Sequence, residues 1–268
     1  MRVETVGDGP AEVAVVGGIH GDEPCGVHAV EQLLADPPAV ERAVKFVVAN
    51  EGAIERGVRY VDEDLNRAFP GDPEGGTHEQ KLAAAVADEL AGCEVLSLHS
   101  TQSYGGLFAL VDRLGEFERG VCPHLPVDAV VETGQFSEGR LFEATDRVVE
   151  VECGYQGSDA AADNAVAVTE AFLRAAGVLS GEHLTRDRAD GTAELPVYRL
   201  TKPVPKAAAQ AYEVFASNFR RVGAGEAFAA ADEEEYVADE PFYPVLMSPY
   251  GYEDVFGYAA DRIDTLSD

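Results

Sequence analysis

Short apolar runs alternate with helix-periodic stretches up to about residue 178. Runs of this length and character are typical of buried strands. We predict four such strands, at residues 11–16, 43–48, 93–98 and 147–152. The longer segments between them have the spacing of amphipathic helices.

Three helices are predicted between and after these strands. The first begins at Pro24, the second opens with the capping-box pattern Thr77-His78-Glu79-Gln80, and the third covers residues 158–176. Their apolar stripes comprise Val27, Val30 and Leu34 in the first helix and Leu82, Val86 and Leu90 in the second. Such alternation predicts an α/β fold with a mostly parallel or mixed sheet flanked by helices. Ligands of such sheets gather at the carboxyl ends of the strands.

The character of the sequence changes after Gly177. Residues 179–268 are rich in proline, glycine and aromatic residues, with short strand-like runs at 196–200 and 212–215. The 268 residues therefore divide into an α/β catalytic domain over 1–178 and a small β-rich subdomain over 179–268.

Two predicted strands end in a histidine. His20 follows the first strand in a glycine-rich turn, with Glu23 three positions later, and His99 follows the run at 93–98. Imidazole and carboxylate are zinc ligands, and catalytic zinc usually has three protein ligands and one open position. The sequence therefore predicts a zinc site of His20, Glu23 and His99. The alternatives are a turn histidine with a solvated glutamate, and a core histidine at a strand end.

The segment from Arg56 to Gly71 has no clean helical or strand period and is predicted to be a loop. In it, Arg59 and Arg67 offer planar guanidinium groups that grip carboxylates. Asp64 is placed to orient a zinc-binding histidine from behind. For Glu63 we favour a solvated surface ion pair.

A carboxylate also ends the fourth predicted strand. Glu152 lies just past the β-branched run that begins at Val148, and Glu150 shares its face if the strand is regular. A general base needs a carboxylate within hydrogen-bond reach of the attacking water. Position at the strand end favours Glu152.

Together these motifs resemble the succinylglutamate desuccinylase and aspartoacylase family of zinc amidohydrolases, which is related to the zinc carboxypeptidases. The resemblance covers residues 11–176, with Tyr243-Pro244-Val245 and the following tyrosines similar to the family's closing segment. It implies a carboxypeptidase-like fold and one zinc ion per chain. The roles it implies are zinc ligation by His20, Glu23 and His99, general base and acid for Glu152, and substrate or oxyanion contacts for Arg59, Asn66, Arg67 and Tyr252. Tyr250 competes with Tyr252, and Arg140 is the candidate for a further arginine that some members use to bind a second acidic group.

The charge of the chain points to high salt. The formal net charge is −29, and the basic residues are 16 arginines and 4 lysines. Self-repulsion of this size works against a compact state, but the screening length falls to about 3 Å in 1 M salt. The composition suggests a halophile with high internal salt, and it argues against nucleic-acid and anionic membrane partners.

The remaining features indicate a cytoplasmic protein. No stretch reaches the length of an apolar membrane span, the start at Met1 has no signal-peptide pattern, and four cysteines without Cys-x-x-Cys spacing are expected to be reduced thiols. Whether the chain forms a homo-oligomer stays open.

The functional hypothesis is a zinc-dependent deacylase that hydrolyses the amide or ester of an N-acyl amino acid or similar small molecule. A zinc carboxypeptidase acting on peptides and a catalytically inactive metal-binding relative are the alternatives. A phosphate-binding loop and a serine-hydrolase elbow have no matching motif.

Overall fold

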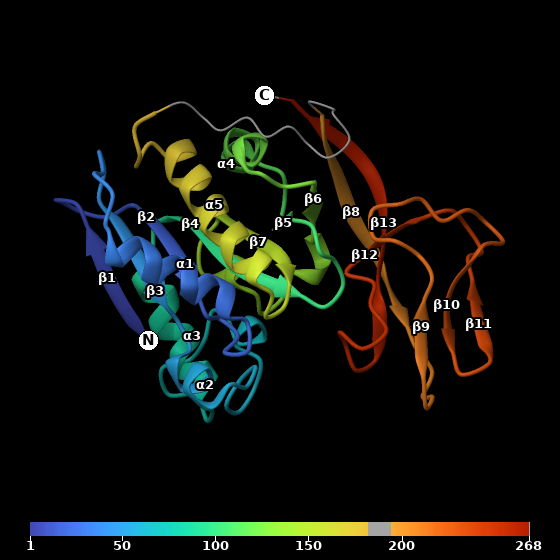
Figure 1. The fold of residues 1–268 in the computed structure, drawn as a ribbon. Helices are drawn as coiled ribbons and strands as arrows, with labels where there is room; N and C mark the ends of the chain where they lie inside the picture. The colour runs from blue at the N-terminus through green and yellow to red at the C-terminus, as the bar shows by residue number, and fades with distance from the viewer. Residues whose placement is uncertain (182–193, 268) are drawn as a thin grey trace.

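A computed structural model describes residues 1–181 and 194–267, and part of the predicted C-terminal subdomain, 182–193, lies outside the described residues. Ten strands form one large mixed sheet, in the order β1-β3-β2-β4-β7-β5-β6-β8-β13-β12 (Figure 1). The strands are β1 (Arg2–Val6), β2 (Val13–Gly17), β3 (Val44–Val48), β4 (Glu94–Thr101), β5 (Phe108–Val111), β6 (Ala129–Glu132), β7 (Val148–Tyr155), β8 (Leu195–Pro205), β12 (Tyr243–Val245) and β13 (Val255–Leu266).

The centre of the sheet is parallel. Strands β3, β2, β4 and β7 run in one direction, β5 is antiparallel to β7, and β5, β6 and β8 are parallel to one another. The four predicted strands correspond to β2, β3, β4 and β7. The predicted α/β class with a mixed sheet flanked by helices is confirmed.

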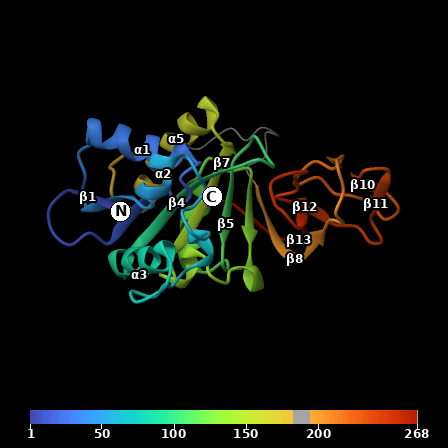
Figure 2. The ribbon, with the colours of Figure 1, turned by 90° about the horizontal axis from the view of Figure 1, so that it is seen from below.

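Each central strand is buried on both faces, which explains its continuous apolar character. Val13 and Val15 face the core beneath helices α1 (Pro24–Ala35) and α5 (Asp159–Ala175), whereas Ala14 and Val16 face the core beneath α3 (His78–Leu90). Figure 2 shows α1 and α5 on one side of the sheet and α3 on the other. The shorter helices are α2 (Glu51–Arg56) and α4 (Glu116–Val121).

The helices begin where the sequence predicts. Pro24 opens α1, Thr77 Oγ1 accepts a hydrogen bond from Gln80 N at the start of α3, and Ser158 caps α5. The buried stripe of α3 comprises Leu82, Val86 and Leu90, as predicted.

The predicted stripe of α1 is shifted from the observed one. The buried face comprises Cys25, Gly26, Ala29, Val30 and Leu33, while Val27 and Leu34 are only partly buried. The reason is a close approach between two glycines, because a Cβ on Gly26 would lie 2.9 Å from Gly17 Cα and 2.9 Å from Leu98 Cβ. This contact places Gly26 against the sheet, so that Val27 and Leu34 come to lie at the edges of the buried face.

The C-terminal region contributes to two sheets. Strands β8, β13 and β12 extend the large sheet, and β9 (Tyr212–Val214), β10 (Ala227–Ala231) and β11 (Glu234–Val237) form a separate small sheet. The β-rich character of this region is confirmed. A domain boundary at residue 178 stays a prediction, since β8 pairs directly with β6.

Among the described residues, no helix is long and apolar enough to cross a membrane. The four cysteines are free and buried, as expected for reduced thiols.

Candidate functional site

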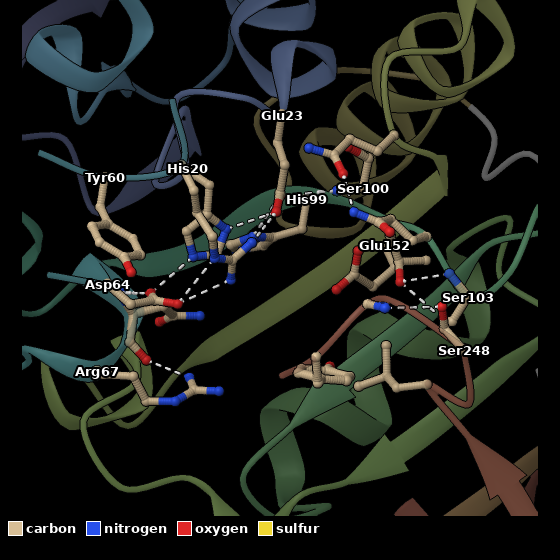
Figure 3. Close-up of a pocket in the computed structure, with 18 of the residues that line it drawn as sticks. His20, Glu23, Tyr60, Asp64, Arg67, His99, Ser100, Ser103, Glu152 and Ser248 are labelled. Atoms are coloured by element: carbon tan, nitrogen blue, oxygen red, sulfur yellow. Dashed lines mark hydrogen bonds and ion pairs between the residues drawn. The ribbon is translucent and has the colours of Figure 1, made fainter. Parts of the chain in front are cut away.

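The polar strand ends open into one pocket of about 430 Å³ at the carboxyl edge of β2, β4 and β7 (Figure 3). Its walls come from the turn after β2, the segment from Arg59 to Arg67, the end of β4 and the segment from Leu246 to Glu253. Every site residue named from the sequence lines this pocket, namely His20, Glu23, Arg59, Asp64, Asn66, Arg67, His99, Glu152 and Tyr252, and so does Arg140.

Glycines shape the turn that presents His20. Gly18 has φ +71°, a conformation that side chains other than glycine's rarely adopt. A Cβ on Gly21 would lie 2.3 Å from the carbonyl carbon of Ala53, so the turn packs against the backbone of α2. The glycines on either side of His20 therefore have steric causes.

The three candidate metal ligands converge. One ligand atom from each of His20, Glu23 and His99 lies within 4.8 Å of the other two, and all three residues are buried. Nδ1 of His20 is 2.8 Å from Glu23 Oε1, and Nδ1 of His99 is 3.2 Å from Glu23 Oε2. Figure 3 shows both rings directed at the glutamate. The arrangement offers two imidazole nitrogens and a carboxylate to one ion.

The electrostatics of this cluster suit a cation. Burial alone would raise the pKa of Glu23, but the two neighbouring histidines outweigh burial and hold it well below the usual range. Burial likewise works to lower the pKa of His20, yet Glu23 and Asp64 raise it to about 9. The buried Glu23 carboxylate therefore requires positive charge beside it, which a proton on His20 provides when no metal is bound and which a metal ion would provide after displacing that proton.

Asp64 fixes the orientation of His20. Its Oδ1 lies 3.0 Å from His20 Nε2, and its Oδ2 accepts hydrogen bonds from Arg59 Nε and a terminal guanidinium nitrogen at 3.1 and 3.0 Å. A carboxylate can only accept, so His20 Nε2 carries the proton that it donates to Asp64. Nδ1, which faces Glu23, is then the nitrogen of this ring that could bind a metal ion. Arg59 also donates to Glu23 Oε1 at 3.0 Å.

A buried glutamate outside the pocket holds the segment that carries Arg59 and Asp64. The side chain of Glu79, on α3, is fully buried and accepts hydrogen bonds from the backbone N–H groups of Val61, Asp62 and Glu63 at 2.7 to 3.3 Å. Asn50 Nδ2 donates a fourth at 3.1 Å. Sequence analysis recognised Glu79 only as part of a helix-start pattern, because backbone partners leave no trace in sequence.

We expect Glu79→Ala to lower the free energy of unfolding by about 2 kcal/mol or more, since it leaves three backbone N–H groups and the buried Asn50 amide without their acceptor. Urea denaturation at neutral pH measures this, with the exposed Asp88→Ala on the same helix as the matched control. Burial would raise the pKa of Glu79, but its hydrogen bonds lower it below the usual 4.5. The contribution of the Glu79 carboxylate to the free energy of unfolding is therefore complete above pH 4.5 and is lost as the pH falls through the lowered pKa of the folded protein. Equal stability of the two variants would contradict this role.

Glu150 and Glu152 share one face of β7, two residues apart, but have different surroundings. Glu150 is fully buried, and its carboxylate accepts from Asn66 Nδ2 at 3.0 Å and pairs with Arg140. Glu152 lines the pocket, and its buried Oε2 has no hydrogen-bond partner among the described residues. Burial, followed by the charge of Glu23, raises the pKa of Glu152 to about 7. The position favoured from sequence is therefore the one that reaches the pocket.

The predicted substrate-binding residues Asn66 and Arg67 differ in how many of their polar atoms already have partners within the protein. The amide of Asn66 is used within the protein, since its Nδ2 donates to Glu150 and its Oδ1 accepts from Leu141 N. Arg67 donates to the carbonyl oxygen of Asn66 but, within the described part of the chain, forms no ion pair within 4.0 Å.

Tyr252 and Tyr250 lie in different places. Tyr252 lines the pocket, and burial raises the pKa of its phenol, which stays protonated at neutral pH. Tyr250 is 60% exposed, and its hydroxyl accepts from Tyr212 N instead. Lys206 Nζ donates to the carbonyl oxygens of Pro249 and Tyr252 and so anchors the segment that carries Tyr252.

Several pocket residues were not identified from the sequence. They are Tyr60, Ser100, Thr101, Gln102, Ser103, Gln156, Leu246, Ser248, Gly251 and Glu253. Most lie close in sequence to a predicted site residue, either near the end of β4 or β7 or in the C-terminal segment that contains Tyr252. This closeness was the only feature of the sequence that could have identified them.

Fold and site define an α/β protein with a cluster of potential metal ligands at the carboxyl edge of its sheet. Residues 10–103 match the model of the succinylglutamate desuccinylase/aspartoacylase catalytic domain. This match confirms, over those residues, the resemblance carried by the sequence motifs. A comparison with curated sequences finds no match.

Solved structures share the fold over nearly the whole chain. A succinylglutamate desuccinylase/aspartoacylase from Rhodobacter sphaeroides gives a TM-score of 0.81 at 18% identity, covering 97% of this chain and 89% of that one. The ectoine utilization protein EutE (DoeB) from Ruegeria pomeroyi gives 0.78 at 20%, covering 99% and 88%. Murine aminoacylase 3 gives 0.73 at 21%, covering 96% and 97%. At such identities the similarity concerns the fold.

Proposed function

We propose that the protein is a zinc-dependent deacylase that hydrolyses the amide or ester bond of a small N-acyl amino acid. The observation that carries this proposal is the coexistence of two features in one pocket. Three buried ligand atoms lie within 4.8 Å of one another, and Glu152 Oε2 is buried beside them without a partner. A metal binder without catalysis would not require that second feature.

The donor set fits zinc. Two imidazoles and one carboxylate match catalytic zinc sites, which leave a further position open. Asp64 behind His20 is the carboxylate–histidine arrangement common around such ions. A zinc ion bound by His20, Glu23 and His99 supplies Lewis-acid polarisation of the scissile carbonyl and lowers the pKa of water.

Glu152 is the proposed proton carrier. With its pKa near 7, it accepts a proton from the attacking water at neutral pH and returns it to the leaving amine. Arg59 uses three of its five N–H groups on Asp64 and Glu23, so others remain to hold the developing oxyanion.

Arg67 is proposed to bind the α-carboxylate of the substrate. It lines the pocket and lacks an acidic partner within 4.0 Å in the described chain, whereas Asn66 is engaged with Glu150 and positions the segment between them. The protonated hydroxyl of Tyr252 is a further donor to the substrate.

The small size of the pocket supports a deacylase over a carboxypeptidase. Residues from Leu246 to Glu253 form one wall, and Asn218 ties this segment to the end of β4 through hydrogen bonds with Ser103 O and Met247 N. A long peptide needs an open cleft, which the C-terminal segment narrows.

The test is a screen of N-acyl amino acids, esters and short peptides with the zinc-loaded protein in molar salt. Release of the amine from N-acyl amino acids supports the proposal. Cleavage of peptides alone would favour a carboxypeptidase, and no turnover with stoichiometric zinc would favour an inactive relative.

We also propose that the protein works in a cytoplasm of high salt. We expect its melting temperature and activity to fall sharply from molar to dilute salt, because the screening length grows from about 3 Å at 1 M to about 30 Å at 0.01 M. The excess of acids behind the net charge of −29 would then repel one another. Calorimetry across this range is the measurement, with an uncharged osmolyte in dilute buffer as the control. A melting temperature that stays constant from molar to dilute salt would contradict the proposed adaptation to high salt.

A further inference from the structure

Glu150 is a buried carboxylate that the proposed reaction does not use. It lies on β7, fully buried behind the pocket, and has two partners that line the pocket, Asn66 and Arg140. Asn66 Nδ2 donates to its Oε1, and the Arg140 guanidinium donates to its Oε2. Both oxygens of Glu150 therefore have a partner, whereas the buried Nε of Arg140 has none among the described residues.

The pairing decides how many positive charges the pocket offers to a substrate. Arg59 is compensated by Asp64 and Glu23, and Arg140 is compensated by Glu150. In the described part of the chain, Arg67 is thus the one pocket arginine without an ion pair within 4.0 Å. A substrate with one carboxylate finds one guanidinium for it.

A second carboxylate on the substrate would meet an unfavourable charge balance near Arg140. With Glu152 in its basic form, Arg140, Glu150 and Glu152 together carry one net negative charge; Glu150 is fully buried, and the Arg140 side chain keeps 12% of its surface exposed. A buried charge without a partner is costly, and like charges at close range add to that cost. A neutral or polar side chain carries no such penalty.

We propose that Glu150 neutralises Arg140 and thereby restricts the enzyme to N-acyl amino acids that carry no second negative charge, in either the side chain or the acyl group. This inference rests on the proposed deacylase function. Glu150 is in this role a residue that determines specificity by acting through Arg140, without itself touching the substrate.

Isosteric substrate pairs measure the restriction directly. N-acetylasparagine and N-acetylaspartate have nearly the same shape and differ in one charge, as do N-acetylglutamine and N-acetylglutamate. We expect kcat/KM for the amide member of each pair to exceed that for the acid by at least about 10-fold, since like-charge contacts cost several kcal/mol. The ratio is taken within one sample, so misfolded fraction and zinc content cancel.

Glu150→Gln tests the residue. Glutamine keeps an oxygen for the hydrogen bond from Asn66 but removes the charge that neutralises Arg140. We expect the acid-to-amide ratio of kcat/KM to rise by at least about 10-fold, and the Glu150→Gln/Arg140→Gln double variant to lose that gain. Zinc content is measured alongside, because Glu150 Oε1 lies 4.0 Å from His99 Nε2.

Glu132→Gln is the matched control. Glu132 is also a buried glutamate, paired with Arg199 at 2.7 Å, but it lies on β6 and does not line the pocket. Its substitution should leave the ratio unchanged. For a variant with too little turnover, calorimetric binding of aspartate and asparagine gives the same comparison.

Two results would overturn the inference while leaving the deacylase proposal standing. One is a wild-type preference for the acid members of both pairs, which would make Arg140 a carboxylate clamp. The other is an acid-to-amide ratio that does not respond to Glu150→Gln in turnover or binding. Failure of the deacylase proposal itself looks different, because then none of the four substrates would be hydrolysed.

Discussion

Glu152→Gln is expected to lower turnover by at least about 100-fold while zinc content and substrate affinity stay close to those of the wild type. Glutamine keeps the size and polarity of the side chain but cannot accept a proton, and general acid–base catalysis contributes about 10²- to 10⁴-fold. The measurement is steady-state kinetics with metal analysis on the same samples.

In the wild type, burial and Glu23 raise the pKa of Glu152 to about 7. Because the base form is active, kcat/KM should rise with pH through an acid limb at or below that value, and this limb should be absent in the variant.

Glu94→Gln is a suitable control for this experiment, because Glu94 begins β4 at the opposite end of the sheet and pairs with Arg147. Its turnover should match that of the wild type. If Glu152→Gln retained turnover within a few-fold of wild type, Glu152 would have no part in proton transfer, and another acid would have to carry the proton.

The His20→Ala/His99→Ala double variant is expected to lose stoichiometric zinc and all measurable hydrolysis. The variant leaves Glu23 as the single protein donor of the predicted set, and two of three ligands cannot be replaced by distant groups. Equilibrium dialysis followed by metal analysis measures the loss. The metal-dependent gain in melting temperature, which a ligand that binds only the folded state must produce, should disappear with it.

The exposed His28, on α1, provides the control for histidine loss in general. His28→Ala should bind one zinc ion per chain with wild-type stability. Retention of stoichiometric zinc in the double variant would mean that the ion binds elsewhere, and the proposed mechanism would have to be abandoned.

Much of the fold follows from local patterns. The buried strands β2, β4 and β7 are continuous apolar runs, and a parallel sheet brings their carboxyl ends to one edge. His20 lies three residues past β2, whereas His99 and Glu152 lie within the last residues of β4 and β7 rather than past them as predicted. Thr77 and Pro24 mark helix starts through chemistry that needs no distant partner. Distant contacts set the rest, as in α1, where the contact between Gly17 and Gly26 decides which side of the helix is buried.

The sequence by itself determined the class of fold and which residues lie near the carboxyl ends of the central strands, because short apolar runs are enough to predict buried strands and their direction. Tertiary structure decided what each polar residue does there. Glu150 and Glu152 lie two positions apart on the same face of β7, and the sequence places both equally well. Asn66 and Arg140 reach Glu150 from segments 84 and 10 residues away and bury it, whereas Glu152 Oε2 remains without a partner in the pocket. The difference between a positioning group and a proton acceptor thus arises from hydrogen bonds between distant segments, which only the folded chain brings together.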